Sequence, residues 1–114
     1  MNEAVAEAKR WWWQRISAMV LALCVLVHLA VIVYAARSGI TAAHILARTH
    51  GSWGFGLFYA TFVVACAVHV PIGLAAIARE WLGWPKGLAL NASRAFAVLL
   101  LVMGLRAVFA VVAA

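Results

Sequence analysis

Residues 16–36 read ISAMVLALCVLVHLAVIVYAA, an apolar run that has no charged side chain and one histidine, His28. Apolar runs of about 18 residues or more are long enough to cross the hydrocarbon core of a bilayer as an α-helix. Residues 54–78 form a second such run, again with one histidine, His69, and residues 95–114 form a third. We therefore predict an all-α integral membrane protein with three transmembrane helices at about these positions.

The composition of the chain agrees with this prediction. Of its 114 residues, 68% are hydrophobic and 11% are charged, whereas a soluble domain is roughly half apolar and a quarter charged. Membrane-spanning β-strands alternate polar and apolar residues, and these runs do not. Because a spanning segment must satisfy its own backbone hydrogen bonds, the runs are expected to be helices. Without internal repeats or a second compositional region, residues 1–114 are expected to form a single membrane-anchor domain.

Basic residues beside the runs predict the orientation. The N-terminal flank and the second connection carry three basic residues each, and the first connection carries two, which places the N-terminus in the cytoplasm. The first 15 residues contain Glu3 and Glu7 and resemble neither a signal peptide nor a transit segment, so a bacterial cytoplasmic membrane is expected. The net charge of +6 is accounted for by these flanks, and no nucleic-acid partner is expected.

The connections are short. The first contains helix-start signals at Ser38 and Thr41 and a stop signal at Gly51, which indicates a short interfacial helix. The second, residues 79–93, contains Gly-Pro punctuation and is expected to be a turn. Two cysteines inside apolar runs, Cys24 and Cys66, are interpreted as small packing residues.

Two histidines inside apolar runs call for an explanation, because polar side chains at bilayer depth are costly and usually functional. An imidazole there can hydrogen-bond across helices, relay protons or ligate a metal such as haem iron. Measured from the expected cytoplasmic edge, His28 lies about 18 Å deep and His69 about 14 Å deep. Similar depths allow one haem held by both histidines, or two haems each completed by a partner subunit. Gly73, four residues after His69, leaves room for a macrocycle or another helix, and Pro71 tends to kink the helix.

Residues 11–29, WWWQRISAMVLALCVLVHL, and residues 68–83, VHVPIGLAAIAREWLG, resemble a known family. It is the small three-helix cytochrome b subunit that anchors succinate dehydrogenase or the related fumarate reductase (succinate:quinone oxidoreductase). Three helices, short connections and a cytoplasmic N-terminus are common to that family and to the expectations above.

Two short motifs carry the resemblance. The family's first helix opens with His-Arg-x-Ser-Gly, and residues 14–18 of this chain read QRISA. The family's second helix has a haem-ligating His, a Gly four residues later and an Arg two residues after that. This chain has His69 and Gly73, but Ala75 stands where the Arg would be.

Carried over by resemblance, His69 is a haem b ligand, and Arg15 and Ser17 belong to a quinone site near the cytoplasmic face. His28, eleven residues after Ser17, resembles the first-helix ligand of two-haem members and implies a second, more distal haem b. Arg106, expected near the middle of the third helix, would then meet a haem propionate or, alternatively, an acidic residue on a partner helix.

The resemblance implies a membrane anchor that takes part in electron transfer between an iron–sulfur subunit and quinone, with one or two haem b groups as cofactor and quinone as substrate. The expected partners are a flavoprotein subunit, an iron–sulfur subunit, a second hydrophobic membrane subunit and membrane lipid. The chain would be a non-flavin subunit of the enzyme and would have no catalytic activity alone, since it lacks a dinucleotide-binding fingerprint and an iron–sulfur cysteine cluster.

Three other classes of membrane protein are alternatives. A haem-free membrane assembly or interaction subunit would use both histidines for helix packing. The cytochrome b anchor of another respiratory dehydrogenase, such as a hydrogenase or formate dehydrogenase, typically has four helices and more histidines. A small multidrug-type transporter needs a membrane-embedded acid, and the three runs contain no Asp or Glu.

Overall fold

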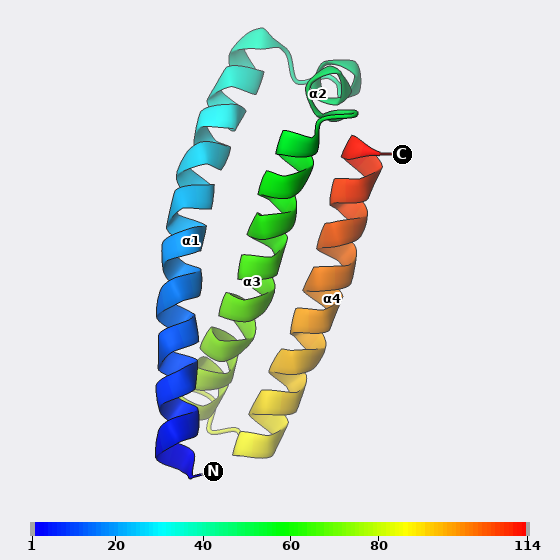
Figure 1. Ribbon diagram of the computed structural model, residues 1–114. Coiled ribbons are helices and arrows are strands. Elements are labelled where there is room, and N and C mark those ends of the chain that lie inside the picture. The colour runs from blue at the N-terminus through cyan, green and yellow to red at the C-terminus, as the bar shows by residue number, and fades with distance from the viewer. Residues whose placement is uncertain (1, 114) are drawn as a thin grey trace.

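The computed structural model describes residues 2–113, which fold into four α-helices (Figure 1). The three long helices are α1 (Glu3–Ser38), α3 (Trp53–Glu80) and α4 (Lys86–Val112), and the short helix α2 (Ala42–Thr49) connects α1 to α3. Each long helix is apolar and long enough to cross a membrane. The prediction of an all-helical chain with three helices able to span a membrane is therefore confirmed.

The short helix predicted in the first connection is also confirmed. The Thr41 side chain caps α2 by accepting a hydrogen bond from the backbone N–H of His44, at 3.2 Å. The last residues of α2 then cap α4, because the Thr49 hydroxyl and the Gly51 N–H donate to the carbonyls of Val111 and Val112, at 2.8 and 2.7 Å. Helix ends leave such carbonyls without intrahelical partners, so these bonds tie α2 to the C-terminal end of α4.

One helix is longer than its predicted span, and one predicted boundary is wrong. Helix α1 begins at Glu3, because Asn2 caps a helix that continues without a break into the apolar run of residues 16–36. The connection expected over residues 79–93 is a turn only as far as Pro85, and α4 begins at Lys86. Pro85 has a φ of −59°, which suits a helix start, and the residues after it are mostly good helix formers.

Helix α3 is the central element of the bundle. It packs against α1 on one side and α4 on the other, and runs antiparallel to both (Figure 1). Small residues form its closest contacts, since Ala75 and Ala78 of α3 bury against Ala89 of α4. Helices in membranes approach one another through such small residues.

Large apolar side chains point outward. Leu23, Leu26 and Leu57 are each more than 60% exposed, and among residues 2–113 no large side chain is fully buried. In water this arrangement would expose far more apolar surface than a monomeric protein normally shows. In a bilayer the same side chains would contact apolar acyl chains, which agrees with a membrane protein.

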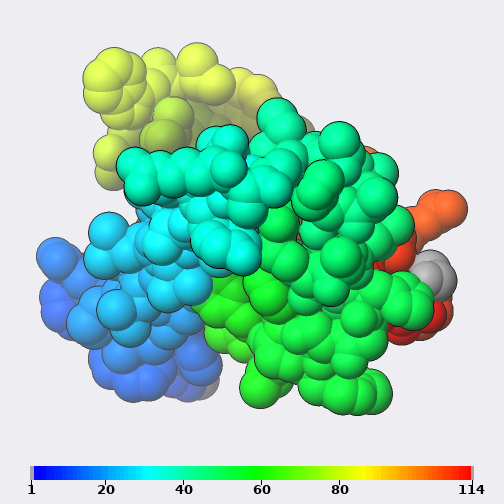
Figure 2. Space-filling model, turned by 90° about the horizontal axis from the view of Figure 1, so that it is seen from above, coloured from blue at the N-terminus to red at the C-terminus, as the bar shows by residue number. Residues whose placement is uncertain are grey.

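The two ends of the bundle differ. Figure 2 looks down on the end that carries α2, where that helix and its connections lie in front of the long helices. The opposite end holds the start of α1, the end of α3 and the start of α4 (Figure 1). There Lys86 pairs with Glu3, which ties the first turn of α4 to the first turn of α1.

A substitution at Gly104 is expected to separate α3 from α4. A Cβ atom at this position would lie 2.6 Å from a methyl carbon of Val63, a side chain with little rotational freedom. Gly104→Ala should lower the free energy of unfolding by about 1–3 kcal/mol, as overpacking does elsewhere. Denaturant titration in detergent micelles checks this.

The matched control is Gly87→Ala, also in α4, where an added Cβ would meet nothing within 4 Å. It should leave stability unchanged or slightly raised. Val63→Ala combined with Gly104→Ala should recover stability. If Gly104→Ala proves as stable as the parent chain, the close approach of α3 and α4 is wrong.

Candidate functional site

His69 lies against α1, where it meets Ser17. The distance between His69 Nδ1 and Ser17 Oγ is 3.3 Å, and Ser17 is buried. The Ser17 hydroxyl donates its proton to the Gln14 carbonyl at 3.1 Å. With the Ser17 proton on the Gln14 carbonyl, His69 Nδ1 would be the donor to Ser17, because a hydroxyl has only one proton to give. In that tautomer the imidazole would carry its lone pair on Nε2, the form in which a neutral histidine ligates a metal.

Gly73 allows α1 to approach α3 closely. A Cβ on Gly73 would lie 3.4 Å from Gln14 Nε2, so the space beside this glycine is taken by Gln14 of the neighbouring helix. Of the two occupants expected from the sequence, a macrocycle or another helix, the structure therefore contains the helix. Within residues 2–113, Gln14 Oε1 is buried and accepts no hydrogen bond. A buried acceptor left in this way costs about 1–3 kcal/mol, so a donor on a ligand or partner would be favourable here.

His28 has a different environment nearer the α2 end. Its Nδ1 atom is 3.1 Å from the Tyr59 hydroxyl, and its ring meets the rings of Tyr59 and Phe62 edge to face. The ring lies in the wall of a cavity of about 500 Å³ that α1, α3 and α4 form together. This volume is within the range of small-molecule sites. Other side chains in the wall are Cys66, Leu100 and Met103.

The two histidines lie at different heights in the bundle. His28 pairs with Tyr59 and His69 pairs with Ser17, and Tyr59 and His69 are ten residues apart on α3. The separation along the helix is about 15 Å. The prediction of similar depths is wrong, because the ends of the first two apolar runs are not level. His69 lies beside Ser17, at the start of the first run, whereas His28 lies beside Tyr59. The two histidines of a single chain therefore do not meet at one height in the bundle.

Arg15 and Ser17 do not converge. They are two residues apart on α1, about 200° around the helix, so they face different sides. Ser17 is buried against α3 and lines an apolar cavity of about 380 Å³ with Trp13 and Val64, whereas Arg15 is exposed with its guanidinium 5.0 Å from the Trp11 ring. The structure therefore does not bring the two side chains together, and their assignment to a quinone site stays a prediction.

Arg106 is exposed on α4, six residues before the last residue of that helix. It is therefore about 9 Å from the helix end and not at mid-depth, because α4 begins earlier than the sequence indicated. Its height nearly matches that of His28, since its neighbour Gly104 lies opposite Val63. However, Arg106 is not among the residues that line the cavity beside His28, so the structure does not bring these two predicted residues together.

Sequence reasoning missed Tyr59 as a partner of His28. Tyr59 is a lone phenol in an apolar run and lies ten residues before His69. Ser17 similarly lies eleven residues before His28. The matched spacing of two polar pairs on antiparallel helices was the available signal. Among residues 2–113, no three His, Cys, Asp or Glu side chains cluster in a way that could hold a metal ion.

Three comparisons with known proteins add nothing to this geometry. The chain matches no family model, no curated protein and no solved structure.

Removal of the Ser17 hydroxyl should release the His69 ring. In Ser17→Ala, Nδ1 of His69 loses its acceptor, and the loss of one part-buried hydrogen bond should cost about 1 kcal/mol of unfolding free energy. Nitrogen-15 NMR of histidine-labelled protein should show His69 protonated at Nδ1 in the parent chain and a mixture of tautomers in the variant. Ser38→Ala, at an exposed serine that donates to the Tyr34 carbonyl, is the control and should leave the His69 signals unchanged. A parent His69 protonated at Nε2 would contradict the assigned hydrogen-bond direction.

Proposed function

We propose that this chain is the membrane anchor and haem b-binding subunit of a succinate:quinone oxidoreductase in a bacterial cytoplasmic membrane. In this role it would contribute to the quinone site and to electron transfer between an iron–sulfur subunit and quinone. The proposal is supported by the motif resemblance at residues 14–18 and at His69 and Gly73, together with three helices able to span a membrane.

The observation that carries the proposal is the hydrogen-bonded state of His69. His69 Nδ1 is 3.3 Å from Ser17 Oγ, and Ser17 Oγ is 3.1 Å from the Gln14 carbonyl. In the tautomer that is protonated at Nδ1, Nε2 of His69 would remain as a lone-pair donor. Metal-ligating histidines commonly donate their other ring N–H in this way, which fixes the tautomer and orients the ring.

The donor set fits haem ligation with one histidine per level of the bundle. His69 would serve one haem b, and His28, in the wall of its 500 Å³ cavity, would serve a second. The opposite ligand at each level would come from a second hydrophobic subunit or another copy of this chain. Haem b with two imidazole ligands supplies one-electron transfer and leaves no open iron position for oxygen chemistry.

Ser17 is then a positioning residue for His69, and it also borders the cavity between α1 and α3. That cavity is apolar and has Trp13 at its wall, which suits a quinone ring. The outward direction of Arg15 suits a contact with the quinone or propionate bound at a neighbouring subunit, because guanidinium pairs bidentately with carboxylates. The flavin and iron–sulfur chemistry would belong to partner subunits on the cytoplasmic side.

A haem-free assembly subunit is the second candidate. One specific observation favours it, since both histidines already have hydrogen-bond partners within the chain, Ser17 and Tyr59. Helix packing alone would be sufficient to account for these pairs.

A haem count separates the two candidates. The chain would be purified with its co-purifying subunits, and the difference spectrum between dithionite-reduced and oxidised forms recorded with haem per polypeptide. His69→Ala should remove one haem, His28→Ala should remove the other, and the double variant should remove both. His44→Ala, which alters an exposed histidine in α2, is the control and should retain the full count. If the parent protein contains no haem, the haem-binding proposal is wrong and the haem-free assembly subunit is the remaining candidate.

The proposed orientation has its own test. Single cysteines at position 7 in α1 and position 43 in α2, Glu7→Cys and Ala43→Cys, would be treated with a membrane-impermeant maleimide. In intact spheroplasts the cysteine at 43 should react, and the cysteine at 7 should react only after permeabilisation. The reverse pattern would place the N-terminus outside the cytoplasm.

A further inference from the structure

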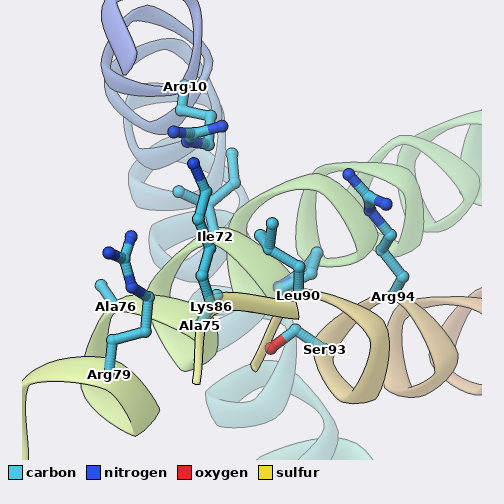
Figure 3. Close-up of a pocket in the computed structure, with 10 residues that line it drawn as sticks. Arg10, Ile72, Ala75, Ala76, Arg79, Lys86, Leu90, Ser93 and Arg94 are labelled. Atoms are coloured by element: carbon cyan, nitrogen blue, oxygen red, sulfur yellow. The ribbon is translucent and has the colours of Figure 1, made fainter. Parts of the chain in front are cut away.

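A cationic hollow of about 350 Å³ lies at the end of the bundle where α1 and α4 begin and α3 ends. All three long helices contribute a basic side chain to it: Arg10 from α1, Arg79 from α3, and Lys86 and Arg94 from α4. In Figure 3 the charged groups of Arg79 and Lys86 rise toward the same side as Arg10, and Leu90 lies between Lys86 and Arg94.

The positive charge of the hollow exceeds the negative charge beside it. Glu3 pairs with Lys86, and Glu80 lines an adjoining hollow together with Arg79 and Lys86. Four cations thus face two carboxylates, and the three arginines come from three different helices. Guanidinium groups are suited to phosphate, because each can donate two parallel hydrogen bonds to its oxygens.

The floor of the hollow is apolar and continues toward the middle of the bundle. Ile72, Ala75 and Ala76 of α3 form part of the floor. Val64, Ala65 and Val68 precede them at helical spacings of three or four residues, so all lie on one face of α3. These three residues line the apolar cavity of about 380 Å³ beside Ser17. From Ala75 to Val64 the stripe measures about 16 Å, close to the depth of one bilayer leaflet.

Two tryptophans beside the hollow fit a position at the membrane interface. Trp13 lines the cavity along the stripe, and Trp84 lines the adjoining hollow next to Arg79. Tryptophan collects at the level of lipid headgroups, and basic pockets between spanning helices at that level attract anionic headgroups.

We propose that this end of the bundle binds one anionic phospholipid. Arg10, Arg79 and Arg94 hold its phosphate, and one acyl chain lies along the α3 stripe from Ile72 to Val64. Lys86, already paired with Glu3, adds to the positive field. Charge complementarity at the hollow and the apolar stripe that continues from it select a lipid over an acidic protein segment, which would have no use for the stripe. The proposal is independent of haem binding.

The test uses the full chain reconstituted in mixed phosphatidylcholine and phosphatidylglycerol bilayers and then released for native mass spectrometry. The parent chain should retain one phosphatidylglycerol in clear preference to phosphatidylcholine. Removal of a cation near an anionic lipid should weaken binding by roughly fivefold, so Arg79→Gln and Arg94→Gln together should abolish the preference. Arg37→Gln, at an exposed arginine in the last turn of α1 at the other end, is the matched control and should retain it.

A second variant tests the hollow without a change in charge. Ala76→Trp places a bulky ring at an exposed position of the floor and should displace the lipid while circular dichroism shows full helicity. Inorganic phosphate should not displace the lipid, because it cannot use the stripe. Equal retention of both lipids by the parent chain, equal loss in Arg37→Gln, or displacement by inorganic phosphate alone would overturn the proposal.

Discussion

The register between α1 and α3 is the constraint on which the rest of the structure depends. Two polar pairs, Ser17 with His69 and His28 with Tyr59, connect the same two helices. The two pairs are about 15 Å apart along the helix axis. In hydrocarbon no water is present to form a hydrogen bond with an unpaired polar group. A slide of one helix along the other would break both pairs and is therefore unfavourable. Each histidine is thereby held at a fixed height in the bundle.

The sequence predicted the features that are decided within one segment of the chain, and it did not predict those that depend on how two helices pack. Helix content, three spanning runs and the Thr41 cap are local, because run length and capping chemistry decide them. The relative heights of His28 and His69 are not, because they require the register between two helices. In the structure His69 is level with Ser17, a register that the edges of the two apolar runs do not give. The opposite directions of Arg15 and Ser17 follow from helical geometry alone and were within reach of the sequence.

The two proposed sites lie at different ends of the same small bundle. Residues of α1, α3 and α4 near the α2 end line the His28 cavity, whereas residues of the same helices at the opposite end line the cationic hollow. Between them, Ser17 and Val64 border a third cavity. Because few large side chains are buried, space for ligands exists where a soluble protein would have a packed core. A partner subunit, haem or lipid would then complete the packing that the chain lacks by itself.

The unbroken course of α1 has a mechanical consequence. From Glu3 to Ser38 this helix contains neither glycine nor proline, whereas α3 carries Pro71 and Gly73 close to His69. Glycine and proline are where helices bend, so α1 is a stiff rod and α3 is the pliable member of the pair. A push delivered at the N-terminal turn, outside the lipid, would therefore travel along α1 as one rigid displacement and reach Ser17 and His28 together. The displacement would be taken up by bending of α3 at Pro71 and Gly73, close to His69.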